Sequence, residues 1–323
     1  MSGDEPRREA HVTAHAKVNL FLRVLAREAS GYHQIETLFQ RLELGDPVVV
    51  RVRDAGRTLD CDGADTGPVE RNLAWRAALA YAESTGWPNG FAIEIEKRIP
   101  VGGGLGGGSA DAGAVLRCLN AMAPTPLDAS ELLALATPLG ADVPFLTTEA
   151  PLALAWGRGE RMLALPTLPE RRVHLALFEE GVATGPAYAA LAALRGDGAV
   201  PRAILWRPER FTTWDDVALV ATNDFEDVVL RDRRDVAEVR EMFTTVCRSV
   251  DQWHPTFGER TDGGGTAFSL MSGSGATVFL MSPPGGSGLV LRIEPPADEP
   301  DSTALRVVET TTATRVAPVM LAG

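Results

Sequence analysis

Six glycines occupy the seven positions from residue 102 to residue 108, within the stretch IPVGGGLGGGSADAGAVL. Glycine loses more backbone entropy on folding than any other residue, so an ordinary loop does not favour so many of them. The strand-like segment FAIEIEKRI precedes the loop, and apolar residues at helical spacing follow it from Val115. The N–H groups of a glycine-rich turn and the positive end of a helix that begins near Ser109 suit phosphate groups. The stretch therefore predicts a phosphate-binding loop rather than a flexible linker.

Three common nucleotide-binding motifs have glycines at these spacings, and the sequence context argues against each. A dinucleotide-binding fold requires a second strand that ends in an acidic residue about 20 positions later, whereas that distance falls at Asp128, before a predicted helix. A P-loop requires lysine where Ser109 stands. The motifs that follow the glycine loop of protein kinases are missing from the sequence. Phosphate binding would therefore rely on backbone N–H groups, with the Ser109 hydroxyl placed to contact a phosphate or its Mg²⁺.

Only two of the 31 basic residues are lysines, Lys17 and Lys97. A bias toward arginine could leave two lysines by chance, or both positions could require a compact ammonium that a planar guanidinium cannot replace. Lys97 directly precedes the glycine loop and could add positive charge there. Lys17 lies in VTAHAKVNLFLRV, which alternates without a break over residues 12–24 and predicts a strand with one buried face. Lys17 and Asn19 then project from the same face, about 7 Å apart.

Tyr32 and His33 follow a turn signal, EASG, at residues 28–31. The segment IETLFQRLEL then resumes a strand pattern, so the opening of the chain predicts an antiparallel pair of strands. An aromatic ring and an imidazole at such a turn can stack on a planar ligand and form hydrogen bonds with it. Local packing of a hairpin end is the other interpretation.

Strand and helix signals continue along the rest of the chain without a repeat of fixed period. Asp128 and Glu131 fit a capping box before a helix that ends at Pro138, and Ser109 or Asp111 is placed to cap the helix after the glycine loop. The other expected elements are helices over 72–85 and 225–243, strands over 91–99 and 171–178, a glycine turn that enters a strand within 268–281, and exposed loops at 282–288 and 294–302.

Composition limits the kinds of partner. The net charge of -12 leaves no overall basic field for nucleic acid or an anionic membrane. No run of about 18 apolar residues predicts a membrane span, and the first residues do not resemble a signal peptide. Three widely spaced cysteines fit neither a disulfide framework nor a zinc site. We expect a soluble, cytoplasmic protein.

Four stretches, taken in order, resemble the GHMP kinase superfamily. They are AHAKVNLFLRV (14–24) with SGYHQIETLFQ (30–40), EKRIPVGGGLGGGSADA (96–112), LGADVPF (139–145) and MSGSGATVF (271–279). The resemblance extends over residues 12–280. It implies an α+β fold with two domains: a mixed α/β ATP-binding domain over 10–160 and an α/β sandwich domain over 161–323.

The resemblance also implies an activity and two catalytic residues. The protein would use ATP and Mg²⁺, and its G-Y-H element is similar to that of members that phosphorylate the 2-hydroxyl of 4-diphosphocytidyl-2-C-methyl-D-erythritol, a step toward isoprenoid precursors. Asp142 resembles the aspartate that accepts or orients the hydroxyl proton. Lys17 resembles the lysine that pairs with this aspartate and favours a developing alkoxide.

Binding residues follow from the same resemblance, although the metal ligands do not. The ATP-binding set comprises Pro100, Val101, Gly102, Gly103, Gly104, Leu105, Gly106, Gly107, Gly108, Ser109 and Ala110, with Lys97 added from its position before the loop. The substrate-binding set comprises Asn19, Tyr32, His33, Gly273, Ser274 and Gly275.

The chain departs from the superfamily pattern at three places. Ala110 stands where many members have a second serine, residues 251–266 look inserted, and the region 281–323 is rich in proline where a helix is usual. Two alternatives stay open: a related kinase for mevalonate, homoserine or a sugar, and an inactive binding protein on the same fold. The G-Y-H element counts against the first alternative. The presence of both Lys17 and Asp142 counts against the second.

Overall fold

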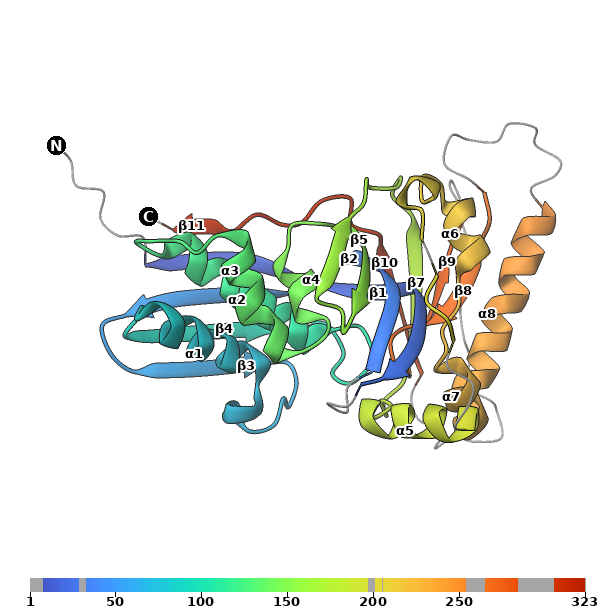
Figure 1. The fold of residues 1–323 in the computed structure, drawn as a ribbon, viewed down its shortest axis with the longest axis horizontal. Helices are drawn as coiled ribbons and strands as arrows, with labels where there is room; N and C mark the ends of the chain where they lie inside the picture. The colour runs from blue at the N-terminus through green and yellow to red at the C-terminus, as the bar shows by residue number, and fades with distance from the viewer. Residues whose placement is uncertain are drawn as a thin grey trace.

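Two β-sheets organise the chain (Figure 1). The structure is a computed structural model and describes residues 8–28, 33–196, 201–204, 206–253, 265–283 and 305–322. The larger sheet has the order β11-β1-β2-β4-β3, with β5 paired to β2 and to β6, and the smaller sheet has the order β10-β7-β9-β8. The strands are β1 (Glu9–Arg27), β2 (His33–Arg53), β3 (Arg57–Asp62), β4 (Gly90–Glu96), β5 (Leu152–Gly157), β6 (Arg161–Ala164), β7 (Arg172–Leu177), β8 (Phe268–Met271), β9 (Val278–Met281), β10 (Arg306–Thr311) and β11 (Met320–Ala322).

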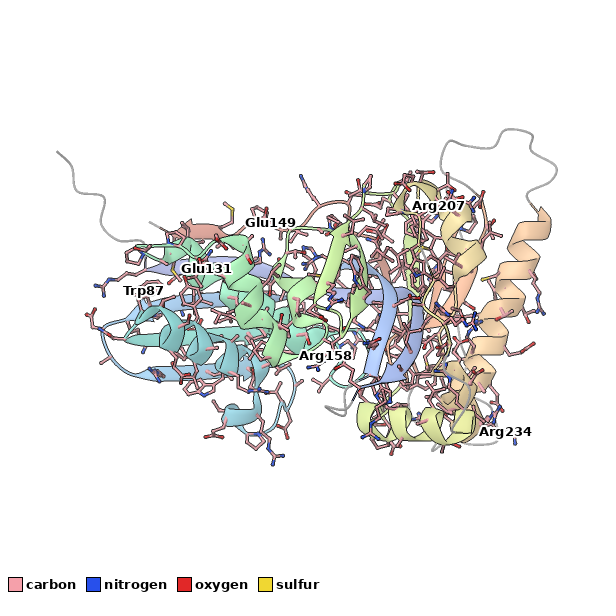
Figure 2. All side chains as sticks on the ribbon, viewed as in Figure 1. Trp87, Glu131, Glu149, Arg158, Arg207 and Arg234 are labelled. Carbon is pink, nitrogen blue, oxygen red and sulfur yellow. The ribbon has the colours of Figure 1, made fainter. Side chains whose placement is uncertain are left out.

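Helices pack against each sheet, so the expected α+β class is confirmed (Figure 1). Those beside the larger sheet are α1 (Leu73–Thr85), α2 (Gly107–Met122), α3 (Ala129–Ala136) and α4 (Val143–Thr147). Those on the side of the smaller sheet are α5 (Thr184–Arg195), α6 (Trp214–Val220), α7 (Glu226–Asp232) and α8 (Arg234–Trp253). Charged side chains such as Glu131 and Arg234 lie at the outer surface (Figure 2). In the described part of the chain, no helix is long and apolar enough to cross a membrane.

β1 is longer than expected and is buried on both faces. His15, Lys17 and Asn19 are each no more than 3% exposed, so the prediction of only one buried face is wrong. The glycine loop and α4 cover this face: a Cβ on Gly106 would lie 3.1 Å from the Lys17 side chain. Register shifts after His15 and after Asn19 also interrupt the pairing with β2. Such irregularities can re-aim a side chain.

The helix after the glycine loop begins earlier than its polar residues suggest. α2 starts at Gly107, and its N-cap is Gly106 at a φ of 73°, with no side-chain cap. Capping by Ser109 or Asp111 was therefore the wrong expectation, because the glycine turns the chain directly into the helix. The capping box of Asp128 and Glu131 before α3 is confirmed.

The second half of the chain differs from expectation in where its helices and strands are interrupted. The expected helix over 225–243 is two helices, α7 and α8, that meet at Arg233. The segment 268–281 forms two antiparallel strands, β8 and β9, around its glycine turn. The expected loops at 282–288 and 294–302 lie almost entirely outside the described residues, as does most of 251–266.

The division into 10–160 and 161–323 stays a prediction. β6 begins at Arg161 and pairs with β5 of the larger sheet. β11, near the end of the chain, pairs with β1 of the same sheet. Strand pairing at these two places therefore crosses the expected boundary.

A buried cluster of charges fixes both ends of the glycine loop. The Lys97 Nζ lies 2.5 Å from Asp46 Oδ2 and 2.7 Å from Asp111 Oδ2. Asp46 belongs to β2 and also accepts a hydrogen bond from the Ile99 N–H, while Asp111 belongs to α2. The cluster thus ties the start of the loop and the first turns of α2 to the sheet. Lys97 was expected to supply charge to a phosphate, but two carboxylates already compensate its ammonium.

We expect Lys97→Met to lower the free energy of unfolding by about 3–5 kcal/mol, because it leaves two buried carboxylates without a counter-charge. Urea unfolding measures this loss. Adding Asp111→Asn to Lys97→Met should recover part of it, since one of those charges is then removed. The exposed Arg98, which pairs with Glu96, gives the control Arg98→Met, with little expected effect. Wild-type stability of Lys97→Met, combined with weaker ATP binding, would instead favour the phosphate role of Lys97.

Candidate active site

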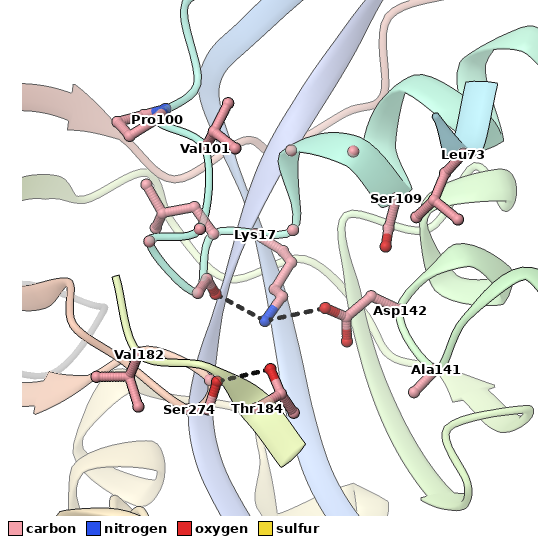
Figure 3. Close-up of a pocket in the computed structure, with 18 of the residues that line it drawn as sticks. Lys17, Leu73, Pro100, Val101, Ser109, Ala141, Asp142, Val182, Thr184 and Ser274 are labelled. Carbon is pink, nitrogen blue, oxygen red and sulfur yellow. Dashed lines mark hydrogen bonds and ion pairs between the residues drawn. The ribbon is translucent and has the colours of Figure 1, made fainter. Parts of the chain in front are cut away.

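Residues that are far apart in the sequence line one cavity of about 650 Å³ (Figure 3). Of the residues expected in the site, those that line it are Lys17, Asn19, Lys97, Pro100, Val101, Gly102, Gly103, Gly104, Leu105, Gly106, Gly107, Gly108, Ser109, Asp142, Gly273 and Ser274. Ala110 and Gly275 are not among the lining residues. Ala110 is 1% exposed and packs in the core, so a methyl group suits this position better than a hydroxyl.

The glycine loop is shaped by close contact with the turn between β8 and β9. Gly104 has a φ of 78°, and a Cβ there would lie 2.2 Å from the carbonyl oxygen of Ser272, so only glycine fits. Gly108, in the first turn of α2, is exposed, and only Leu73 lies near the position of its absent Cβ. The loop therefore presents the N-terminus of a 16-residue helix to the cavity without side chains in the way.

Lys17 and Asp142 lie next to each other in the lining of this cavity. The Lys17 Nζ donates to Asn19 Oδ1 at 2.8 Å. It also donates to the Gly104 carbonyl at 2.9 Å and lies 3.3 Å from Asp142 Oδ2 (Figure 3). Asp142 occupies the N-cap position of α4, but its carboxylate does not cap that helix. The lysine side chain is 2% exposed, whereas that of Asp142 is 27% exposed. A carboxylate that is held by an ammonium yet open to the cavity can accept a proton from a bound hydroxyl.

The Gly-Ser-Gly turn, residues 273–275, and the residue before it contact both β1 and the glycine loop. The Gly273 N–H donates to Asn19 Oδ1 at 3.1 Å, and the Ser272 hydroxyl donates to the Gly104 carbonyl at 3.0 Å. The Asn223 amide in turn donates to the carbonyls of Met271 and Gly273 at 2.7 and 2.8 Å. The turn therefore holds the strand of Lys17 and the glycine loop in one arrangement.

A second cavity, of about 1100 Å³, adjoins the first. Ala141, Thr184 and Tyr188 line both cavities, so the two meet beside Asp142. His33 lines only the second cavity, and Tyr32 lies outside the described residues. The expected phosphate-binding residues and His33 thus line neighbouring cavities.

Tyr188 is the main lining residue that the sequence did not indicate. Its ring stacks on the His33 imidazole, with centroids 4.4 Å apart and planes 12° apart. Burial lowers the pKa of His33, and Arg27 and Arg195 act in the same direction, so the imidazole is neutral near pH 7. Tyr188 lies in α5, in the segment TGPAYAALAALR, where nothing distinguishes it from an ordinary packing residue.

Comparisons with known proteins identify relatives of this chain. The family described as "GHMP kinases N terminal domain" matches residues 72–149. The "4-diphosphocytidyl-2-C-methyl-D-erythritol kinase" of Desulfotalea psychrophila is 35% identical over 272 residues, which are 83% of this chain and 84% of that protein. The protein of the same name from Geobacter sp. strain M21 is 36% identical over 275 residues, 84% of this chain and 89% of the relative.

Solved structures extend the comparison to the whole chain. A crystal structure of a "4-(cytidine 5'-diphospho)-2C-methyl-D-erythritol kinase" has 33% identity and a TM-score of 0.63, and covers 94% of this chain and 98% of that one. A homoserine kinase from Cytophaga hutchinsonii has 15% identity and a TM-score of 0.57, with 99% of each chain covered, and shares the fold. The protein is therefore a member of the GHMP kinase family and, within it, of the 4-diphosphocytidyl-2-C-methyl-D-erythritol kinases.

Proposed function

We infer that the protein transfers the terminal phosphoryl group of ATP to the 2-hydroxyl of 4-diphosphocytidyl-2-C-methyl-D-erythritol, in the non-mevalonate (methylerythritol phosphate) route to isoprenoid precursors. Membership of the family makes it an ATP-dependent kinase. One observation carries the mechanism: the pair of Lys17 and Asp142 lies where the two cavities meet. A phosphoryl donor in one cavity and an acceptor alcohol in the other would come together at this pair.

The phosphates of ATP bind the glycine loop in this proposal. Residues 101–109 supply backbone N–H groups and the N-terminus of α2, which favour negative charge. Lys97 and Ala110 support the loop and do not contact the nucleotide in this proposal, because Lys97 is paired with two carboxylates and Ala110 is buried.

The acceptor binds in the second cavity. We propose that His33, Tyr32 and Tyr188 hold the cytosine ring, because stacked rings and a neutral imidazole suit a planar, uncharged base. Asn19, Gly273 and Ser274, the other expected substrate-binding residues, line the first cavity. Asn19 there accepts hydrogen bonds from the Lys17 ammonium and from the Gly273 N–H.

Transfer then requires one proton movement and one displacement. The Asp142 carboxylate accepts the proton of the 2-hydroxyl, the alkoxide oxygen bonds to the γ-phosphorus, and the bond from that phosphorus to the β,γ-bridging oxygen breaks to release ADP. The Lys17 ammonium stabilises the negative charge that develops on the attacking oxygen. Positioning and charge neutralisation are the main requirements of phosphoryl transfer.

Mg²⁺ is expected to enter with ATP. Among the described residues, no group of three or more His, Cys, Asp or Glu side chains could hold a metal ion. Mg²⁺ is commonly held by one or two carboxylates together with substrate phosphates and water. The Asp142 carboxylate and the Ser109 hydroxyl face the same cavity (Figure 3) and fit that pattern. When bound, the ion would neutralise charge on the phosphates.

ADP release across a panel of alcohols tests the proposed substrate. We expect turnover of 4-diphosphocytidyl-2-C-methyl-D-erythritol and none of mevalonate, homoserine or galactose, because only the first has a planar aromatic base for the His33 and Tyr188 pair. Turnover of mevalonate without the cytidine substrate would overturn the proposal. Absence of ADP release with every alcohol would indicate a binding protein on this fold.

Asp142→Asn should lower kcat by about 10²–10⁴-fold, because a carboxamide cannot take the proton. The KM for ATP should change far less than kcat, since the glycine loop is untouched and Ser109, the phosphates and water would still hold Mg²⁺. Steady-state kinetics on both substrates separate the two effects. The exposed Glu149, just after α4, gives the control Glu149→Gln, which should behave as wild type. Full activity of Asp142→Asn would remove the aspartate from the mechanism.

Tyr188→Leu should raise the KM for the cytidine substrate by about 5–150-fold, because stacking on a base contributes about 1–3 kcal/mol. Tyr188→Phe keeps the ring and should stay close to wild type. The KM for ATP should be the same in both variants. Equal behaviour of Leu and Phe at this position would argue against a ring in the second cavity.

A further inference from the structure

Two neighbouring cations of the larger sheet hold the two ends of α4. Lys17 of β1 and Arg41 of β2 are directly paired across the strands, so their side chains share a face. Lys17 meets Asp142, at the start of α4. Arg41 donates to one carbonyl within the helix, that of Phe145 at 2.7 Å, and to two after it, those of Thr148 at 2.8 Å and Ala150 at 3.1 Å.

Two phenylalanine rings fill the space between these cations. Phe39 of β2 stacks on Phe145 of α4, with centroids 4.8 Å apart and planes 13° apart. The Lys17 Nζ lies 5.7 Å from the centre of the Phe39 ring, and the Arg41 guanidinium lies 4.8 Å from that of Phe145. Both separations are typical of attraction between a cation and an aromatic face. Lys17, Phe39, Phe145 and Arg41 thus form one continuous stack, which we call the α4 stack.

The four side chains of the α4 stack are each no more than 2% exposed. Burial lowers the pKa of Arg41 to about 9, which reflects the cost of keeping a guanidinium away from water. Hydrogen bonds to carbonyl oxygens offset that cost only while α4 and the residues after it stay in place. The cation and the position of α4 therefore depend on each other.

α4 owes its position to contacts with its neighbours rather than to its own length. It contains five residues, and isolated helices shorter than about 12 residues are marginal in water. All five residues are buried, and the helix contacts α3 as well as α2, where Gly113 lets the backbones approach: a Cβ there would lie 2.6 Å from the Leu146 carbonyl group. α4 is thus wedged between α2 and the stack, with Asp142 at its exposed end.

We propose that Phe39, Phe145 and Arg41 are positioning residues that set the separation of the Lys17 ammonium and the Asp142 carboxylate. None of the three lines either cavity, so they reach the reaction only through the α4 stack. The proposal rests on the catalytic roles assigned above to Lys17 and Asp142. Misplacement of a catalytic group by about 1 Å can lower a rate about 100-fold, so the stack would control kcat rather than substrate binding.

Phe39→Leu and Phe91→Leu form a matched pair of variants. Phe91 of β4 is also fully buried in the larger sheet, and the Arg57 guanidinium lies 5.8 Å from its ring centre, but it lies outside the α4 stack. We expect Phe39→Leu to lower kcat about 10-fold or more with the KM for ATP within about twofold, while Phe91→Leu changes kcat by less than about twofold. Thermal unfolding should show comparable losses of stability for the two.

Arg41→Lys and Arg41→Met provide a graded second test. Lysine keeps a cation over Phe145 but cannot reach three carbonyls with a planar fork, so we expect a kcat between wild type and Arg41→Met. If Arg41→Met does not fold, Arg41→Lys and Phe39→Leu still decide the matter. Losses of kcat no larger than that of Phe91→Leu would overturn the proposal. In that case, a large loss of kcat in Asp142→Asn would leave the proposed function intact. A wild-type kcat in Asp142→Asn would overturn both the proposed function and the positioning role of the α4 stack.

Discussion

The structure depends on holding one ammonium group, that of Lys17, in a site that is almost closed to water. A buried charge is costly unless it is paired and hydrogen-bonded. An ammonium has three donors, and three oxygens surround this one: Asn19 Oδ1, the Gly104 carbonyl and Asp142 Oδ2. These oxygens belong to β1, to the glycine loop and to the start of α4. All three donors of the ammonium are therefore hydrogen-bonded or paired only if these three segments meet around it.

The two lysines of the chain show how surroundings change the role of the same group. Lys97 has two buried carboxylate partners, so its charge is used within the fold. Lys17 has one carboxylate partner, and that carboxylate faces a cavity. A compact ammonium suits both places, which gives a physical reason for lysine in a chain that otherwise uses arginine. Asp111, a partner of Lys97, also lines that cavity but its side chain is only 4% exposed, whereas that of Asp142 is 27% exposed and is thus far more open to a substrate.

Local patterns in the sequence predicted local structure well. Alternation over 12–24 correctly placed Lys17 and Asn19 on one face, where they form a hydrogen bond of 2.8 Å. It could not indicate that this face is buried, because the glycine loop and α4 come from later in the chain. For the same reason the sequence did not indicate Tyr188 or the Asp46 partner of Lys97. Capping by Ser109 was wrong because the left-handed Gly106 starts α2 sooner.

In the proposed complex, the acceptor hydroxyl sits beside the pair of Lys17 and Asp142, with its base in the second cavity. The most direct measurement is a crystal structure with a non-hydrolysable ATP analogue and 4-diphosphocytidyl-2-C-methyl-D-erythritol bound together. We expect the 2-hydroxyl oxygen within about 3 Å of the Asp142 carboxylate, and the cytosine ring against Tyr188 and His33. A 2-hydroxyl directed away from Asp142, or a cytosine ring outside the second cavity, would contradict the proposed arrangement.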